Sequence, residues 1–135
     1  MNENEITDAV CAHLRTSGYE ISKRCFTTDQ GIDIVASQNG RECLIEAKGG
    51  TSSREGSARY GNPYTESQVF DRVAKGFYTV ACLRSEKGDE PVIGLALPDT
   101  RWFRKYVAKI SRSAKVLRIT IYWVHPDKLV MEDHL

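Results

Sequence analysis

A two-residue turn, Asn39-Gly40, separates two short apolar stretches and constrains how this part of the chain folds. Asn-Gly is typical of the tight turn that joins two antiparallel strands, because both residues tolerate a positive φ. The stretch before the turn, Gly31–Ala36, is rich in β-branched residues, and the stretch after it, Arg41–Lys48, is apolar in its centre. The pattern therefore predicts a β-hairpin with largely buried strands.

Helical and extended patterns alternate around this hairpin. Ile6, Val10 and Leu14 recur every four residues, as on one face of a helix, and Asn2 with Glu5 predicts a capping box at its start. This order of elements predicts an α/β fold in which helices flank a mixed central sheet. The other expected elements are a weak strand at Tyr19–Phe26, a helix from Thr65 to about Arg84, a strand at Pro91–Leu97, a helix capped by Asp99 that ends near Ser111, and a final strand at Val116–Val124.

The size and composition of the chain limit what it can be. Its 135 residues suffice for a single domain, 1–135, and no segment repeats at a fixed period. No apolar run reaches the roughly 20 residues of a membrane-spanning helix, and the acidic N-terminus is unlike an export signal. We therefore expect a cytoplasmic protein with no membrane partner and with its four cysteines reduced. The last residues, Met131–Leu135, are expected to be frayed.

Two carboxylates and one lysine stand out because they lie in apolar surroundings. Asp33 interrupts the stretch before the turn, and Glu46 and Lys48 end the stretch after it. Residues 46 and 48 project from the same face of a strand, and the hairpin brings that strand beside Asp33. A buried carboxylate needs a partner, and paired carboxylates suit Mg²⁺, which Mn²⁺ is expected to replace. The alternative is a Glu–Lys pair on a solvated strand, with Asp33 in a turn.

These residues resemble the active-site hairpin of the PD-(D/E)XK nuclease superfamily, which has the restriction-endonuclease-like fold. The resemblance rests on Gly-Ile-Asp33-Ile-Val-Ala, a short hairpin and Ile-Glu46-Ala-Lys48-Gly, and it covers roughly residues 3–97. It is strongest to Holliday-junction resolvases and Mrr-like members. The expected elements match the αβββαβ core of this fold, with the last helix and strand as an extension. The resemblance implies that Asp33, Glu46 and the backbone carbonyl of Ala47 bind the metal ion, and that Lys48 is the catalytic lysine.

Two further positions follow from this resemblance. Many members carry a glutamate on the first helix, and Glu3 has the helical phase for this role, whereas Glu5 points the other way. Both glutamates lie far from Gly18, where that helix is expected to end, so the sequence leaves open whether this metal ligand is present. Gln68 resembles a glutamine found beside the catalytic site in several branches. The proline that often precedes the aspartate is replaced by Ile32.

The formal net charge of +1 hides an uneven distribution of basic residues. Between Arg101 and Arg118 there are seven basic residues and no acidic one, with aromatic residues among them that we expect to belong to the core. One set of basic side chains recurs at helical spacing, and a second set shares a face of the preceding helix. Each set predicts either contacts with nucleic-acid phosphates or an ordinary solvated helix surface. The first set is Arg101, Lys105, Lys109 and Arg112, and the second is Arg72 and Lys75.

The segment Gly49–Tyr64 is rich in glycine and serine and directly follows Lys48. It carries Arg54 and Arg59, which predict a flexible loop that orders over bound nucleic acid and holds its phosphates. The alternative is a simple connection between a strand and a helix.

The sequence therefore predicts a small Mg²⁺-dependent endonuclease that hydrolyses phosphodiester bonds in DNA. Asp33 and Glu46 are the expected metal ligands, and Lys48 is expected to act on the attacking water. Two alternatives remain open: a nucleic-acid-binding module on the same fold that has lost its activity, and a subunit of a larger nuclease that needs its partner. The sequence does not indicate which form of nucleic acid is bound. Nor does it show dimerisation, although cutting both strands of a duplex would require two copies of so small a chain, which leaves a homodimer open.

Overall fold

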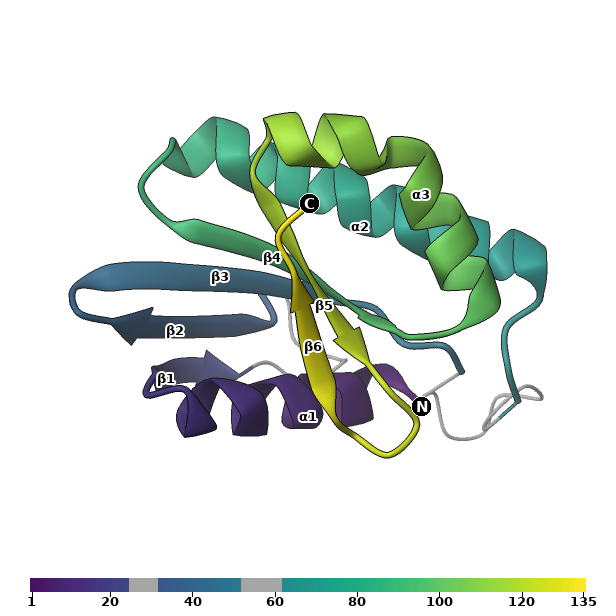
Figure 1. Cartoon of the computed structure of the whole chain (residues 1–135), viewed down its shortest axis with the longest axis horizontal. Helices are drawn as coiled ribbons and strands as arrows, with labels where there is room; N and C mark the ends of the chain where they lie inside the picture. Colours follow the sequence, from purple (N-terminus) through teal and green to yellow (C-terminus); the bar gives the residue numbers. More distant parts are fainter. Residues whose placement is uncertain (25–31, 52–61) are drawn as a thin grey trace.

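The computed structural model describes residues 1–24, 32–51 and 62–135. Figure 1 shows one mixed β-sheet with helices on both faces. The αβββαβ core predicted from the sequence is present, and it is followed by a helix and two strands. The elements are α1 (Glu3–Thr16), β1 (Glu20–Arg24), β2 (Ile34–Gln38), β3 (Arg41–Ala47), α2 (Glu66–Lys87), β4 (Val92–Pro98), α3 (Arg101–Val116), β5 (Ile119–Val124) and β6 (Val130–Asp133).

The six strands lie in the sheet in the same order as in the chain. β1, β2 and β3 are antiparallel neighbours, β3, β4 and β5 are parallel, and β6 is antiparallel to β5. The parallel connections carry α2 and α3, so both helices begin at the end of the sheet where the parallel strands finish. The N-terminal end of α1 lies at this same end, on the right in Figure 1. The positive ends of three helix dipoles therefore gather beside the carboxyl ends of β3 and β4.

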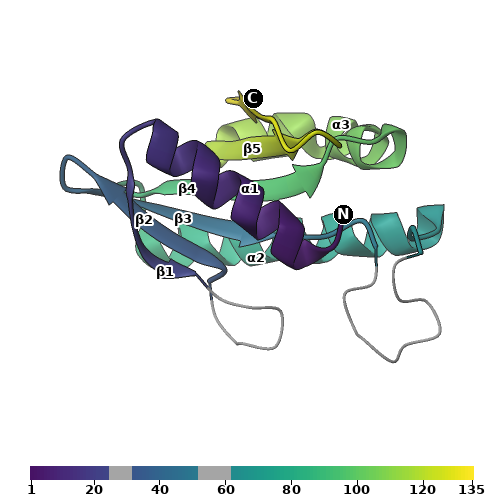
Figure 2. The same cartoon turned by 90° about the horizontal axis from the view of Figure 1, so that it is seen from below.

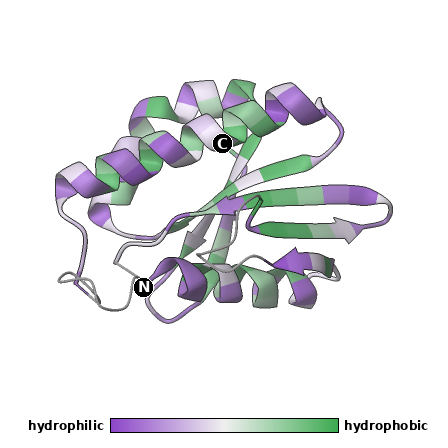
Figure 3. Ribbon diagram, turned by 180° about the vertical axis from the view of Figure 1, so that it is seen from behind, coloured by the Kyte–Doolittle hydropathy of each residue, from purple (hydrophilic) through white to green (hydrophobic). Residues whose placement is uncertain are grey.

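The hydrophobic core has two layers, one on each face of the sheet. On one face Ile6, Val10 and Leu14 of α1 pack against strand residues that include Ile45, as the helical pattern predicted. On the other face α2 and α3 cover the sheet, and Phe103 of α3 is 1% exposed within that layer. Figure 2 shows α1 and α2 on opposite sides of the strands, and Figure 3 shows apolar residues concentrated in the central strands.

Two of the three predicted helix starts are confirmed. The Asn2 side chain accepts a hydrogen bond from the Glu5 backbone N–H at 2.9 Å, and the Glu5 carboxylate accepts one from the Asn2 backbone N–H at 3.3 Å, which completes the capping box of α1. Thr65 caps α2 in the same way, with Gln68 as its partner. The Asn39-Gly40 turn joins β2 to β3, and both residues have a positive φ. None of the helices that the structure describes has the length and apolar character needed to cross a membrane.

The prediction of a frayed tail at Met131–Leu135 is wrong. β6 pairs with β5, with Met131 opposite Trp123. Glu132 also holds the His13 ring at 2.7 Å, from its Oε2 to Nε2. Val130–Asp133 is only four residues long and lacks a strong alternation of apolar and polar residues, so the sequence pattern gives little sign of a strand. The strand forms because these residues pair with the free edge of β5. Val116–Val124 is therefore not the last strand, and the strand there begins only at Ile119.

The predicted helix cap at Asp99 is also wrong. Thr100 occupies the capping position and makes no side-chain cap hydrogen bond. Asp99 instead accepts hydrogen bonds from Arg104 at 2.6 and 3.0 Å and pairs with His125, and the Arg104 bonds lower the pKa of Asp99. α3 also continues beyond Ser111, to Val116, and the serine hydroxyl donates to the Ala108 carbonyl of the same helix at 3.0 Å.

Candidate active site

The hairpin brings the two predicted carboxylates together. Ile34 pairs with Ile45 in the antiparallel register, so Asp33 and Glu46 are the next residues outward on the two strands. Asp33 lies just before β2 and not within it, and its Oδ2 accepts the backbone N–H of Ala47 at 2.8 Å. Asp33 is 7% exposed and Glu46 is 8% exposed. Because both carboxyl groups are buried, the structure does not agree with the alternative of a solvated Glu–Lys pair with Asp33 in a turn.

The two carboxyl groups interact directly. The pKa of Glu46 is raised to about 8, first by burial and then by a hydrogen bond to Asp33 and by the negative charge of Asp33. The positive charge of Lys48 acts in the opposite direction. Without a cation, the pair therefore favours a state in which protonated Glu46 donates to the Asp33 carboxylate.

Lys48 is positioned by the end of β3 and by a glycine of α2. Its backbone N–H donates to the Ala96 carbonyl at 3.0 Å, which continues the parallel pairing with β4. A Cβ atom placed on Gly76 would lie 3.4 Å from Lys48 Cγ and 2.8 Å from Leu95 Cδ1. Gly76 thus lets α2 approach the sheet where the lysine side chain passes. The sequence analysis did not identify it, although a glycine inside a helical pattern often has such a packing role.

The start of α1 contributes a third carboxylate near the pair. Burial raises the pKa of Glu3, the charge of Asp33 raises it further, and the charges of Lys48 and Arg72 lower it. Glu3 therefore lies within electrostatic range of the hairpin, on the helix where the resemblance placed a glutamate. Its role as a metal ligand remains a prediction.

Gly49 is what allows α1 to begin so close to the site. A Cβ atom at this position would lie 2.4 Å from the Glu3 backbone nitrogen and 2.7 Å from the Asn2 carbonyl carbon. Since these are backbone atoms, a side chain could fit only if the first turn of α1 moved away. The sequence analysis noted Gly49 as part of the motif but gave it no role.

The Gly49→Ala variant is expected to loosen the first turn of α1. The backbone N–H groups of Glu5 and Ile6, which now bond to Asn2, should exchange with solvent faster, and unfolding should cost about 1–3 kcal/mol less. Hydrogen exchange followed by NMR measures the first effect, and thermal unfolding measures the second. Amides in the middle of α3 serve as the internal control. Unchanged exchange at Glu5 and Ile6 would contradict the close packing of Gly49 on α1.

The remaining predicted site residues lie in different surroundings. The Gln68 side-chain oxygen accepts the Thr65 backbone N–H at 2.9 Å, so Gln68 caps α2, and its catalytic role remains a prediction. Arg72 lies over the Tyr64 ring, 5.0 Å from its centroid, and donates to the Tyr64 hydroxyl. Arg54 and Arg59 fall outside the described residues, as does most of the predicted loop Gly49–Tyr64.

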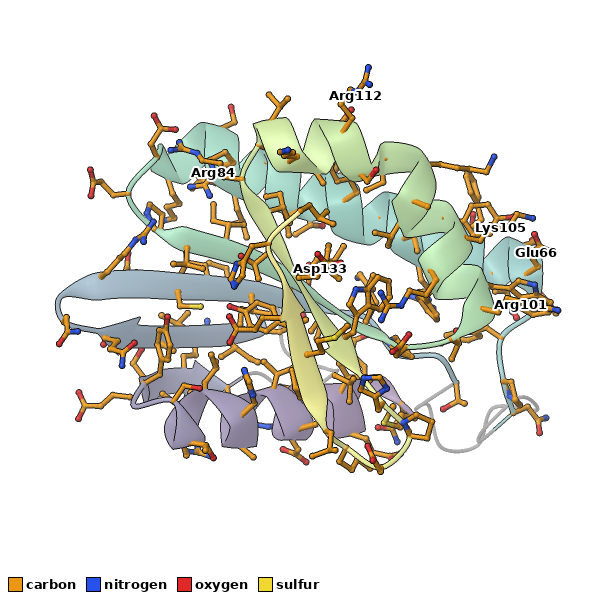
Figure 4. The ribbon with its side chains drawn as sticks, in the orientation of Figure 1. Glu66, Arg84, Arg101, Lys105, Arg112 and Asp133 are labelled. Atoms are coloured by element: carbon orange, nitrogen blue, oxygen red, sulfur yellow. The ribbon has the colours of Figure 1, made fainter. Side chains whose placement is uncertain are left out.

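The basic side chains of α3 are solvent-exposed along one face, while its aromatic residues lie inward as predicted. Figure 4 shows Arg101 and Lys105 beside Glu66 at one end of α3 and Arg112 projecting away from the fold farther along the helix. Lys105 is paired with Glu66 at 2.6 Å. For Lys75, Lys109 and Arg112, no carboxylate of the described residues lies within ion-pair distance.

The donor chemistry of the hairpin fits a small divalent cation. Two adjacent buried carboxyl groups that favour sharing a proton are stabilised when a cation takes the place of that proton. Mg²⁺ commonly uses only one or two carboxylates and completes its shell with other oxygens. Within residues 1–24, 32–51 and 62–135, no three His, Cys, Asp or Glu side chains form a metal-holding cluster. The fit therefore rests on Asp33, Glu46 and the backbone carbonyl of Ala47.

Comparison with known proteins identifies the fold. No protein-family model and no curated protein sequence matches the chain. An XisH family protein from Nostoc punctiforme matches with a TM-score of 0.57 and 16% identity, over 94% of this chain and 96% of that one. An fdxN element excision controlling factor protein from Anabaena variabilis matches with a TM-score of 0.54 and 14% identity, over 95% and 96% of the two chains. At these identities the likeness establishes a shared fold.

Proposed function

We propose that this protein is a divalent-metal-dependent nuclease that hydrolyses phosphodiester bonds in DNA. The observation that carries the proposal is the pair of buried carboxyl groups, Asp33 and Glu46, with Lys48 at the end of the same strand. Two like charges in contact within a low-dielectric site destabilise a fold. Titratable groups with strongly shifted pKa values are concentrated at functional sites, so a catalytic role accounts for this pair better than a structural one.

The roles follow from the chemistry of each group. Asp33, Glu46 and the Ala47 carbonyl would hold Mg²⁺, or Mn²⁺ in its place, and the bound cation would neutralise the charge that develops on the phosphate. Lys48 orients the attacking water and adds a second positive charge beside the phosphodiester. Glu3 and Arg72 lie near enough to Lys48 and Asp33 to adjust the electrostatic field of the site.

The surroundings of the hairpin suit a polyanion. The N-terminal ends of the three helices lie at the same end of the sheet, and helix N-termini attract phosphate groups. α3 has no acidic residue in its first turn, although acidic residues stabilise that position. Arg104 and Lys105 are paired with Asp99 and Glu66, whereas Arg101, the first residue of α3, has no carboxylate within ion-pair distance among the described residues and would be free to contact a phosphate. We also propose that Arg54 and Arg59, which lie outside the described residues, contact the DNA.

A second candidate function is nucleic-acid binding without catalysis, alone or as a subunit of a larger nuclease. The observation that favours it is the description of one structural neighbour as an excision controlling factor, which names control and not cleavage. Both functions would use the same basic surfaces. They differ in whether Asp33 and Glu46 are needed for the activity.

A cleavage screen tests the proposed function. Labelled single-stranded, duplex, nicked and branched DNA and single-stranded RNA are incubated with the full chain in Mg²⁺, in Mn²⁺ or in EDTA. We expect metal-dependent cleavage of at least one DNA form, and none by an Asp33→Asn variant purified in parallel. The parallel variant excludes a contaminating nuclease. If no nucleic acid is cut in either metal, the nuclease proposal is wrong, and binding in the same samples would favour the second candidate.

A further inference from the structure

Two aromatic side chains on α2 face solvent. Phe70 is 52% exposed and Tyr78 is 72% exposed, although both belong to a helix whose other large apolar residues are mostly buried. They are separated by two turns on neighbouring positions of the helix surface, with the small residue Ala74 between them. Exposed apolar side chains that lie together, and not scattered singly, are typical of binding surfaces. We refer to Phe70, Ala74 and Tyr78 as the α2 ridge.

The α2 ridge borders the candidate active site on one side. A cavity of about 380 Å³ is lined by Glu46 and Ile32 from the hairpin region and by Tyr78, Thr79, Cys82 and Glu86 from α2. The proposed metal ligand Glu46 and the exposed ring of Tyr78 therefore share one hollow.

A second cavity lies on the other side of the ridge, between α2 and α3. It measures about 390 Å³ and is lined almost entirely by apolar side chains, which include Phe70, Tyr78 and Tyr106. Lys109 is its charged lining residue, and the exposed Lys75 lies on the same helix as the ridge. Phe70 contacts Tyr106 edge to face, with 5.5 Å between the ring centroids. On this side the surface combines flat aromatic groups with the positive charge of Lys109, whereas the charged side chains that line the first cavity, Glu46 and Glu86, are acidic.

We propose that the α2 ridge binds unpaired nucleotides next to the phosphodiester bond that is cut, with bases stacked on Tyr78 and Phe70 and phosphates near Lys75 and Lys109. This inference rests on the proposed function and names its substrate class: DNA with a single-stranded segment at the cleavage point. Alternating aromatic and basic side chains are the usual means of holding single strands. In a duplex the faces of each base are covered by its neighbours, so a ring can stack only on an unpaired base.

The position of the ridge beside the site and the basic side chains near it favour a nucleic acid over a protein as its occupant. An apolar helix of a partner would fit the groove between α2 and α3, but it would not use the continuous hollow that leads from Tyr78 to Glu46. Lys75, Lys109 and Arg112 have no ion-pair partner among the described residues, and a phosphate backbone would supply one. Continuity with the site and unpaired positive charge together favour a single strand.

Binding measured in EDTA tests this inference separately from catalysis. Fluorescence anisotropy is recorded with a labelled thymidine oligonucleotide and with a hairpin duplex of the same length. Tyr78→Leu, which keeps apolar area but removes the ring, is expected to weaken single-strand binding about tenfold. Tyr78→Phe should bind like the wild type, and duplex binding should change less than twofold in both. Leu129→Ala, which alters an apolar side chain that is 67% exposed on another surface, is the matched control.

Several results would overturn the inference. They are unchanged single-strand binding by Tyr78→Leu, an equal loss for duplex and single strand, or no single-strand binding by the wild type. A change from dimer to monomer in sedimentation velocity, without a change in DNA binding, would show instead that the ridge contacts a second copy. Since EDTA prevents metal-dependent cleavage, a tenfold effect would stand even if the nuclease proposal failed. Conversely, if the wild type cleaves DNA but Tyr78→Leu binds single strands with wild-type affinity, only the proposal for the α2 ridge is contradicted.

Discussion

Lys48→Ala is expected to cut DNA at least about 100-fold more slowly than the wild type under single-turnover conditions, while it keeps its fold. A positioned side chain that orients the nucleophile or transfers its proton typically contributes a factor of about 100 to 10,000. The backbone of Lys48 should stay in place, since its N–H bond to the Ala96 carbonyl does not depend on the side chain. Circular dichroism and thermal unfolding check the fold, and the cleavage rate in saturating Mg²⁺ or Mn²⁺ gives the effect.

Lys87→Ala is the matched control, because Lys87 is an exposed lysine at the end of α2 with no part in the proposed site. It is expected to leave the single-turnover rate unchanged. Equal single-turnover rates for Lys48→Ala and the wild type would remove Lys48 from the mechanism. A large loss in Lys87→Ala would mean that positive charge on α2, and not the hairpin lysine, limits cleavage.

Glu46→Gln is expected to stabilise the metal-free protein at high pH while abolishing cleavage. The pKa of Glu46 is raised from 4.5 to about 8 in the folded protein, so the folded state holds a proton that the unfolded chain releases between these values. This stabilisation is complete below pH 4.5 and is lost as the pH rises through 8. A glutamine stays neutral and can still donate to Asp33, so the variant should not lose stability in this way.

The expected difference at pH 8–9 is on the order of a few kcal/mol, because one pKa unit corresponds to about 1.4 kcal/mol. For a chain of this size that is a difference of several degrees in Tm. Thermal unfolding in EDTA from pH 5 to 9 measures it, and Glu86→Gln, at an exposed position of α2, is the control. Added Mg²⁺ should raise the Tm of the wild type at pH 8 and leave Glu46→Gln unchanged. If the Tm of the wild type and that of Glu46→Gln show the same dependence on pH, the raised pKa of Glu46 does not contribute to stability in this way.

The hairpin could be predicted from the sequence because its signals are local. The Asn39-Gly40 turn fixes the register, and the register places Asp33 opposite Glu46 without information from the rest of the chain. The start of α1 was equally predictable, since Asn2 and Glu5 are three residues apart. The resemblance to known nucleases added expected roles for these residues, which remain predictions, and the solved structures that match the chain share its fold.

Features that depend on distant contacts could not be predicted in the same way. Strand β6 forms because β5 has a free edge with which it can pair. The residue pattern of Met131–Leu135 by itself does not indicate a strand. Asp99 precedes a helix as a cap would, but Arg104 and His125 compete successfully for its carboxylate. The closeness of Glu3 to the hairpin depends on Gly49, which has no Cβ where α1 begins.

A calorimetric titration with Mn²⁺ tests the central claim most directly, because it asks whether Asp33 and Glu46 bind a divalent cation. The full chain is titrated near pH 7.5 without DNA, and the Asp33→Asn and Glu46→Gln variants are titrated in parallel. We expect saturable binding to the wild type, accompanied by proton release from the carboxyl pair, and binding at least about tenfold weaker in both variants. No saturable binding to the wild type, or equal affinity in all three proteins, would contradict this claim.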